Sequence, residues 1–83
     1  MGIHLSVAEA LTKRIKHLIQ EREMTLYQLA LNAGIAHRTL ANITRGSNKA
    51  ANIKTLIKIA GGFDMTISEF LDHSMFDEDN LKL

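Results

Sequence analysis

Eighty-three residues are enough for one small domain, and the absence of cysteine excludes disulfides, thiolate nucleophiles and thiolate metal sites. The apolar runs are too short for a membrane span or a secretion signal, so we expect a cytoplasmic protein. The net charge of +1 conceals a polarised chain, because residues 1–58 carry nine Lys and Arg against three acids, whereas residues 59–83 carry one Lys against six acids. The basic part fits either a solvated surface or a phosphate-binding one.

The first predicted helix starts with a capping box formed by Ser6 and Glu9 and runs to about Glu23. Its apolar residues recur at three- and four-residue steps and form one stripe: Val7, Leu11, Ile15, Leu18 and Ile19. Four basic side chains are expected on the solvent-exposed face: Lys13, Arg14, Lys16 and His17.

Residues 25–46 are predicted to form two short helices joined by a tight turn. Thr25 and Gln28 repeat the capping-box pattern, and Gly34 suits the left-handed residue that ends a helix. The second helix begins near residue 36 or 37 and ends at Gly46, with Leu40 and Ile43 as its only large apolar residues at helical spacing. Its other residues form a polar surface without an acid: His37, Arg38, Thr39, Ala41, Asn42, Thr44 and Arg45. Helices joined so tightly cross steeply, so the second can enter a DNA major groove.

Two more helices are predicted, which gives an all-α fold with five helices over residues 1–72. Asn52 caps the fourth helix, whose buried face is expected to comprise Ile53, Leu56, Ile57 and Ala60. Thr66 and Glu69 form a capping box before a fifth helix that places Ile67, Phe70 and Leu71 inside. We expect these core residues: Leu29, Leu40, Ile43, Leu56, Ile57 and Phe63. No strand is predicted, and residues 73–83 are expected to be an acidic, flexible tail.

The ordered series TLYQLA (25–30), GI (34–35), TLANITRG (39–46), IKTLIKIA (53–60) and TISEFL (66–71) covers most of the chain. This series resembles the Cro/cI-type (XRE) helix-turn-helix family of phage repressors and bacterial regulators. The resemblance implies a five-helix, lambda-repressor-like domain that binds double-stranded DNA, commonly as a homodimer, and it implies no cofactor. The helix-turn-helix proper is residues 25–46.

The resemblance also implies a role for each position. Base contacts fall on the start of the recognition helix and one turn beyond: Ala36, His37, Arg38 and Asn42. Arg can pair with guanine, Asn with adenine, and an alanine methyl can contact thymine. Phosphate contacts fall on the two helices and the loop after them: Thr25, Tyr27, Thr39, Arg45, Asn48, Lys49 and Asn52.

Four positions depart from the family pattern. Leu26 replaces a Gln that braces phosphate, so Tyr27 is expected to take over that contact. Ala36 replaces the Ser or Thr that caps the recognition helix. Thr44 and Ile19 replace a Glu and an Arg that form an ion pair in the family, and we expect an apolar contact in its place.

Other classes of protein remain alternatives. No catalytic constellation is present, and the four histidines lack the short spacings of a metal site, so neither an enzyme nor a metal protein is predicted. An antitoxin or adaptor could bind a protein partner through residues 75–83, and a purely structural helical bundle would use the same core. The apolar residues available for a homodimer interface are Phe70, Leu71, Met75 and Phe76, which could equally complete the core of the monomer.

Overall fold

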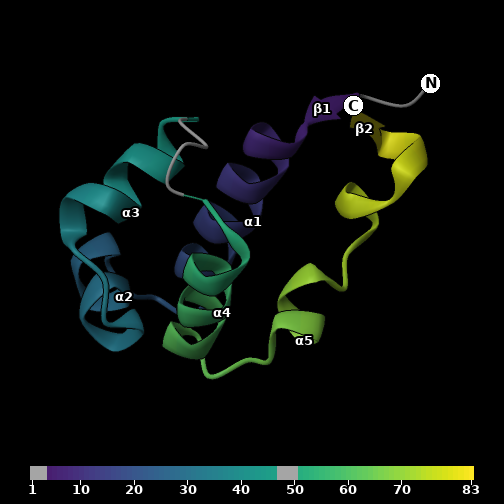
Figure 1. Cartoon of the computed structure of the whole chain (residues 1–83). Coiled ribbons are helices and arrows are strands. Elements are labelled where there is room, and N and C mark those ends of the chain that lie inside the picture. The colour runs from purple at the N-terminus through teal and green to yellow at the C-terminus, as the bar shows by residue number, and fades with distance from the viewer. Residues whose placement is uncertain (1–3, 47–50) are drawn as a thin grey trace.

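The computed structural model describes residues 4–46 and 51–83. Within them the chain forms five α-helices in the predicted order: α1 (Val7–Glu21), α2 (Leu26–Ala33), α3 (His37–Thr44), α4 (Ile53–Gly62) and α5 (Ile67–Leu71). The helices α2 and α3 lie at one side of the molecule and α5 at the other, while α1 and α4 fill the centre (Figure 1). The all-α class with five helices predicted from the sequence is confirmed.

In the hydrophobic core, one face of each helix packs around two phenylalanines. Its fully buried large side chains are Ile15, Leu29, Leu40, Ile43, Ile59, Phe63 and Phe70. The rings of Phe63 and Phe70 are stacked, with centroids 6.4 Å apart. Aromatic pairs at this separation add to the stability that burial alone provides.

The predicted buried face of α4 is partly wrong. Ile53 and Ile57 are 61% and 51% exposed, whereas Ile59 is completely buried. The helix is apolar nearly all round, so two stripes with helical spacing compete. Packing of α4 against α2 and α5 selects the stripe that contains Ile59, Ala60 and the adjoining Phe63.

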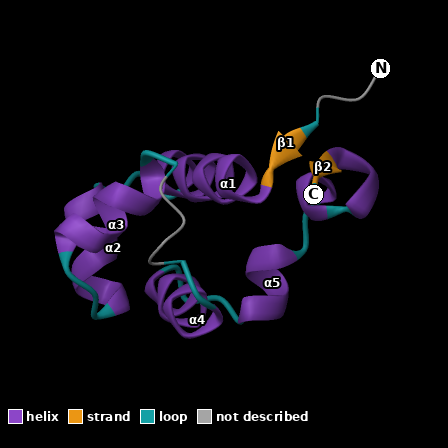
Figure 2. Cartoon of the chain, turned by 45° about the horizontal axis from the view of Figure 1, so that its top comes forward, coloured by secondary structure: helices purple, strands orange, loops and turns teal. Residues whose placement is uncertain are grey.

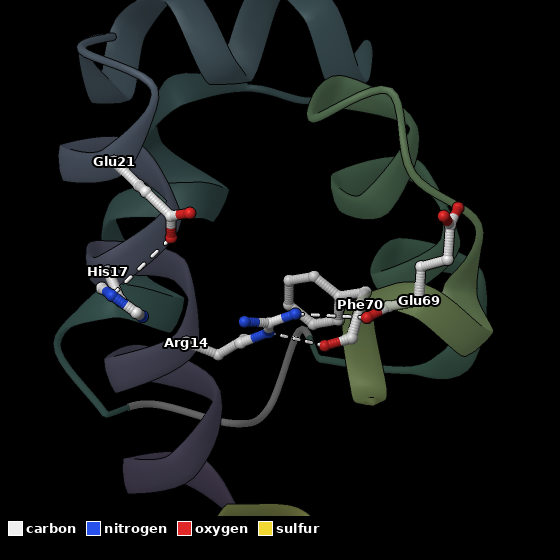
Figure 3. A network of polar contacts seen from close by, with 5 residues as sticks. All are labelled: Arg14, His17, Glu21, Glu69 and Phe70. Atoms are coloured by element: carbon white, nitrogen blue, oxygen red, sulfur yellow. Dashed lines mark hydrogen bonds and ion pairs between the residues drawn. The ribbon is translucent and has the colours of Figure 1, made fainter. Parts of the chain in front are cut away.

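Arg14 is a second correction, because it is buried rather than exposed on α1. Its Nε donates to the carbonyl oxygen of Phe70 at 2.7 Å, and its Nη2 donates to that of Glu69 at 3.2 Å (Figure 3). The guanidinium also lies over the Phe70 ring, 5.9 Å from its centroid. These carbonyls belong to the end of α5, where the helix itself supplies no donors. Packing of α5 against α1 therefore places a charged side chain in the interior.

Arg22 repeats this arrangement at the end of α4. Its Nη1 donates to the carbonyl oxygen of Phe63, the residue that caps α4, and its guanidinium lies 5.9 Å from the centroid of that ring. Farther along the exposed side of α1, His17 and Glu21 form an ion pair at 3.7 Å (Figure 3). Two arginines of α1 thus hold the ends of two later helices.

The segment after α5 pairs with the start of the chain. Two 3-10 turns, η1 (Ser74–Phe76) and η2 (Glu78–Asn80), lead into β2 (Leu81–Lys82), which runs parallel to β1 (Leu5–Ser6) with Leu5 opposite Leu81. Figure 2 shows the two strands side by side. The prediction of no strand is wrong here, because a two-residue pairing leaves no periodic pattern. The flexibility of residues 73–83 stays a prediction.

Side-chain caps start four of the five helices, as predicted. Ser6, Thr25 and Thr66 each accept from the backbone N–H three residues later and form complete capping boxes, and the side chain of Asn52 accepts from Thr55 N. Gly34 ends α2 with a φ of 69°. The remaining helix start, Ala36 before α3, has no side-chain cap.

Two of the capping boxes make stability depend on pH. The hydrogen bonds that Glu9 accepts from Ser6, and Glu69 from Thr66, lower the pKa of each carboxyl below its ordinary value of 4.5. The stability that these ionised carboxyls contribute is present above pH 4.5. It is lost as the pH falls through their pKa values in the folded state. We expect the variant Glu9→Gln/Glu69→Gln to keep both boxes, as Gln28 does in α2, and to lose less stability on acidification.

Urea denaturation at about pH 7 and about pH 3.5, followed by circular dichroism, measures this difference. Equal losses of stability in the wild type and the double variant would show that these carboxyls do not control the acid limb.

Replacing either of the two adjacent glycines in the last turn of α4 with alanine should change the stability, but in opposite directions. A β-carbon on Gly62 would lie 2.9 Å from Leu29 Cδ1 and 3.1 Å from Ala33 Cβ, whereas one on Gly61 would meet nothing within 4 Å. We expect Gly62→Ala to lower the free energy of unfolding by about 1–2 kcal/mol through overpacking. Gly61→Ala should raise it by about 0.5–1 kcal/mol. Thermal melts of the matched pair check the sign, and equal melting temperatures would contradict the close α2–α4 packing.

Candidate nucleic-acid interface

The face of α3 opposite the core is exposed and cationic. Leu40 and Ile43, 0% and 2% exposed, fix the helix to the core. On the other side Arg38 and Arg45 are separated by seven residues, about two helical turns, so they lie on the same face. Asn42 is exposed one turn beyond Arg38, and α3 contains no acidic residue. This face offers hydrogen-bond donors and positive charge along its whole length.

The start of α3 leaves its first backbone N–H groups without a side-chain acceptor. Ala36 occupies the capping position in an extended conformation and makes no side-chain cap, as its sequence predicts. Helix N-termini carry unsatisfied donors and a partial positive charge. Ala36 and His37 are both exposed, so this end of the helix is open to an anionic ligand.

An aromatic contact joins the starts of α2 and α3. The rings of Tyr27 and His37 lie 6.1 Å apart at an angle of 49°. Tyr27 is 60% exposed, whereas its neighbour Leu26 packs against the core. A DNA contact was predicted for each of the two residues, but their contact with each other was not, because it depends on the packing of α2 against α3. Tyr27 therefore helps to position His37, the first residue of α3.

Two of the predicted phosphate contacts, Thr25 and Asn52, cap helices through their side-chain oxygens. Thr25 Oγ1 accepts from Gln28 N at 3.0 Å, and Asn52 Oδ1 accepts from Thr55 N at 2.8 Å. A hydroxyl still has its O–H and an amide its NH₂ after accepting a bond. Among the other predicted phosphate contacts, Arg45 is exposed and Thr39 is half-buried. Asn48 and Lys49 lie outside the described residues.

The structure divides the basic residues into two groups. The guanidinium groups of Arg14 and Arg22 are bound to backbone carbonyls, so both arginines serve the fold. The exposed cations of α1, α3 and α4 are Lys13, Lys16, Arg38, Arg45, Lys54 and Lys58. The acidic residues 77–79 lie at the opposite side of the molecule from α3 in both overall views (Figures 1 and 2). Such a separation of charge orients a molecule in the field of a polyanion.

One side-chain hydrogen bond links α1 to α3. Thr12 Oγ1 donates to the carbonyl oxygen of Ile43 at 3.0 Å. Thr44 Oγ1 donates within its own helix to the carbonyl oxygen of Ala41 at 2.9 Å, and Ile19 packs against the core. Neither replacement leaves an unpaired buried charge. The predicted apolar contact between Ile19 and Thr44 stays a prediction.

Residues 4–46 and 51–83 contain neither a cluster of metal-ligating side chains nor a membrane-spanning helix. No group of three or more His, Asp or Glu side chains in this part of the chain could hold a metal ion. None of its helices is both long and apolar enough to cross a membrane.

Comparisons with known proteins place this geometry in a family. The chain is similar in structure to the prophage Lp1 protein 11, with a TM-score of 0.77 and 23% sequence identity over 89% of this chain and 97% of that one. No curated protein matches the sequence. A family model described as helix-turn-helix matches residues 15–70, from the middle of α1 to α5. The chain therefore belongs to the XRE-type helix-turn-helix family of DNA-binding transcription regulators.

Proposed function

We propose that this protein represses transcription by binding a specific operator through the major groove, with α3 as the recognition helix. The acid-free exposed face of α3 carries this proposal, because Arg38 and Asn42 lie on it beside an uncapped helix start. Arg38 has the fork of donors that matches guanine O6 and N7, and the Asn42 amide matches adenine N6 and N7. Ala36 and His37 complete the set of base-contacting residues.

Phosphate contacts hold the helix in register. Thr25 and Tyr27 lie at the start of α2, which crosses the backbone when α3 occupies the groove. Arg45 caps the end of α3, and Asn52 caps the start of α4 through its Oδ1, while its amide also carries an NH₂ donor. These groups recognise charge and position but carry no sequence information. Affinity should therefore fall steeply as the salt concentration rises.

A homodimer would match an operator with twofold symmetry, and the structure supports a different interface from the one first expected. Phe70 is completely buried, and Phe76 packs on it with ring centroids 6.4 Å apart, so both complete the monomer. Ile53 and Ile57 instead stand exposed one turn apart on α4. We place the contact between two copies at this pair.

Sedimentation with and without operator DNA tests the dimer. The variant Ile53→Ser/Ile57→Ser should remain a monomer under conditions in which the wild type pairs. Leu31→Ser, which changes an exposed leucine of α2, should not alter the pairing. A double variant that dimerises like the wild type would exclude this surface.

Selection of bound sequences from random double-stranded DNA tests the function itself. The expected result is enrichment of one motif, with half-sites about one helical turn apart if two copies bind. Binding that shows no sequence preference at any salt concentration would contradict a role as an operator-specific regulator. A reporter promoter that overlaps the motif then measures repression. Transcription that is the same with and without the protein would exclude a role as a repressor.

A further inference from the structure

A hollow of about 250 Å³ lies where β1, α1 and the end of α3 meet. Its walls come from three elements that are far apart in the sequence: Leu5 of β1, Glu9, Thr12 and Lys13 of α1, and Thr44 and Arg45 of α3. The first turns of α1 and the end of α3 lie at the same edge of the molecule (Figure 1). The hollow opens at the surface beside the last residues of the recognition helix.

Two cations and one carboxylate line this hollow, so its charge balance is positive. Glu9 accepts from the backbone N–H of Ser6 at 3.0 Å, and the hydrogen bonds from Ser6, together with the charges of Lys82 and Lys13, lower the pKa of its carboxyl. Lys13 and Arg45 are both exposed. Two cationic side chains from different helices therefore line the same hollow. Two cations placed in this way can bind the oxygens of one phosphate group.

A hydrogen bond fixes the two helices relative to each other at this point. Thr12 Oγ1, which directly precedes Lys13 in the sequence, donates to the carbonyl oxygen of Ile43, two residues before Arg45, at 3.0 Å. The separation of Lys13 and Arg45 thus depends on a side chain that bridges α1 and α3. A site built on such a contact loses less conformational entropy on binding than two independent surface chains.

The position along α3 relates the hollow to bound DNA. Arg45 follows Arg38 by seven residues on the same face, which corresponds to about 10 Å along the helix axis. The major groove is about 12 Å wide. A helix whose first turn meets base edges therefore brings its last turn to the wall of the groove, where the phosphates lie.

We propose that Lys13 and Arg45 jointly bind one backbone phosphate of the DNA at this hollow, which makes Lys13 of α1 a DNA-contacting residue. The proposal rests on the proposed function of α3. It adds a contact from a helix to which the sequence pattern assigned no DNA contact. Lys13 strengthens binding to all sequences alike and plays no part in base selection.

The salt dependence of binding to the selected operator tests the contact. Replacing Lys13 with Gln should reduce the slope of log K against log salt by about one, so the loss of affinity between about 50 and 200 mM salt becomes about fourfold smaller. Lys13→Arg should restore the slope. Lys58→Gln, which removes an exposed cation of α4 outside the hollow, should leave it unchanged. An unchanged slope for Lys13→Gln, with folding verified by circular dichroism, overturns the proposal.

Neutral methylphosphonate substitutions show whether the two cations share one phosphate. At one position the substitution should weaken binding of the wild type and Lys58→Gln, but it should have little further effect on Lys13→Gln or Arg45→Gln. Sensitivity to two different positions would overturn the shared site while leaving DNA binding intact. If the wild type binds no DNA at all, the proposed function and this inference both fail. If the wild type binds DNA but Lys13→Gln leaves the salt slope unchanged, only this inference fails.

Discussion

Arg38→Ala is expected to weaken binding to the selected operator by about 1–3 kcal/mol and to remove the preference at one base pair. The guanidinium lies exposed on the first turn of α3, and its fork of donors matches guanine O6 and N7. Alanine removes all donors without disturbing the fold, because the side chain has no part in the core. Fluorescence anisotropy on the operator and on each single-base variant measures both effects.

Arg45→Ala is the matched comparison for this experiment. It removes the same charge from the same face of α3, two turns away, and should weaken binding to all operator variants by a similar factor. If Arg38→Ala also weakens every sequence equally, Arg38 binds phosphate and the assignment of base contact is wrong. If it changes nothing, α3 is not the recognition helix.

Arg14→Met should have the largest effect on stability, lowering the free energy of unfolding by about 2–4 kcal/mol. Methionine retains an unbranched apolar stem but cannot donate to the carbonyl oxygens of Glu69 and Phe70, which Arg14 holds at 3.2 and 2.7 Å. It also loses the guanidinium contact with the Phe70 ring. In a domain of this size the loss corresponds to a fall in melting temperature of roughly 10–20 °C.

A calorimetric melt of the purified variant measures this fall, with Lys16→Met as the control on the exposed side of the same helix. The control should change stability by less than about 0.5 kcal/mol. Arg14→Lys should lie between the two, because lysine keeps the charge but loses the planar fork. A melting temperature for Arg14→Met equal to that of the control would show that the arginine does not anchor α5.

The sequence predicted those features that depend on neighbouring residues. Each side-chain cap involves groups three residues apart, so the caps of Ser6, Thr25, Asn52 and Thr66 follow from local chemistry. The missing cap at Ala36 followed in the same way. The exposed face of α3 was also predictable, because two apolar residues leave only one way to orient the helix on a core.

Features that depend on distant packing were not predictable. The spacing of Arg14 in the sequence is that of a solvent-facing residue on α1. The residue is buried because α5, more than fifty residues later in the chain, packs over it. The stripe of α4 could have contained Ile57 or Ile59, and the packing of α2 and α5 decides between them. The hollow beside Lys13 depends likewise on the meeting of β1, α1 and α3, which no single stretch of sequence encodes.

The most direct test of α3 as the recognition helix is titration of isotope-labelled protein with the selected operator, observed through its backbone amide NMR signals. The account predicts the largest shifts along α3 and at the first turn of α2, around Thr25 and Tyr27, with little change in α5 and β2. Shifts concentrated in α5 and the acidic residues 77–79, with α3 unaffected, would contradict it.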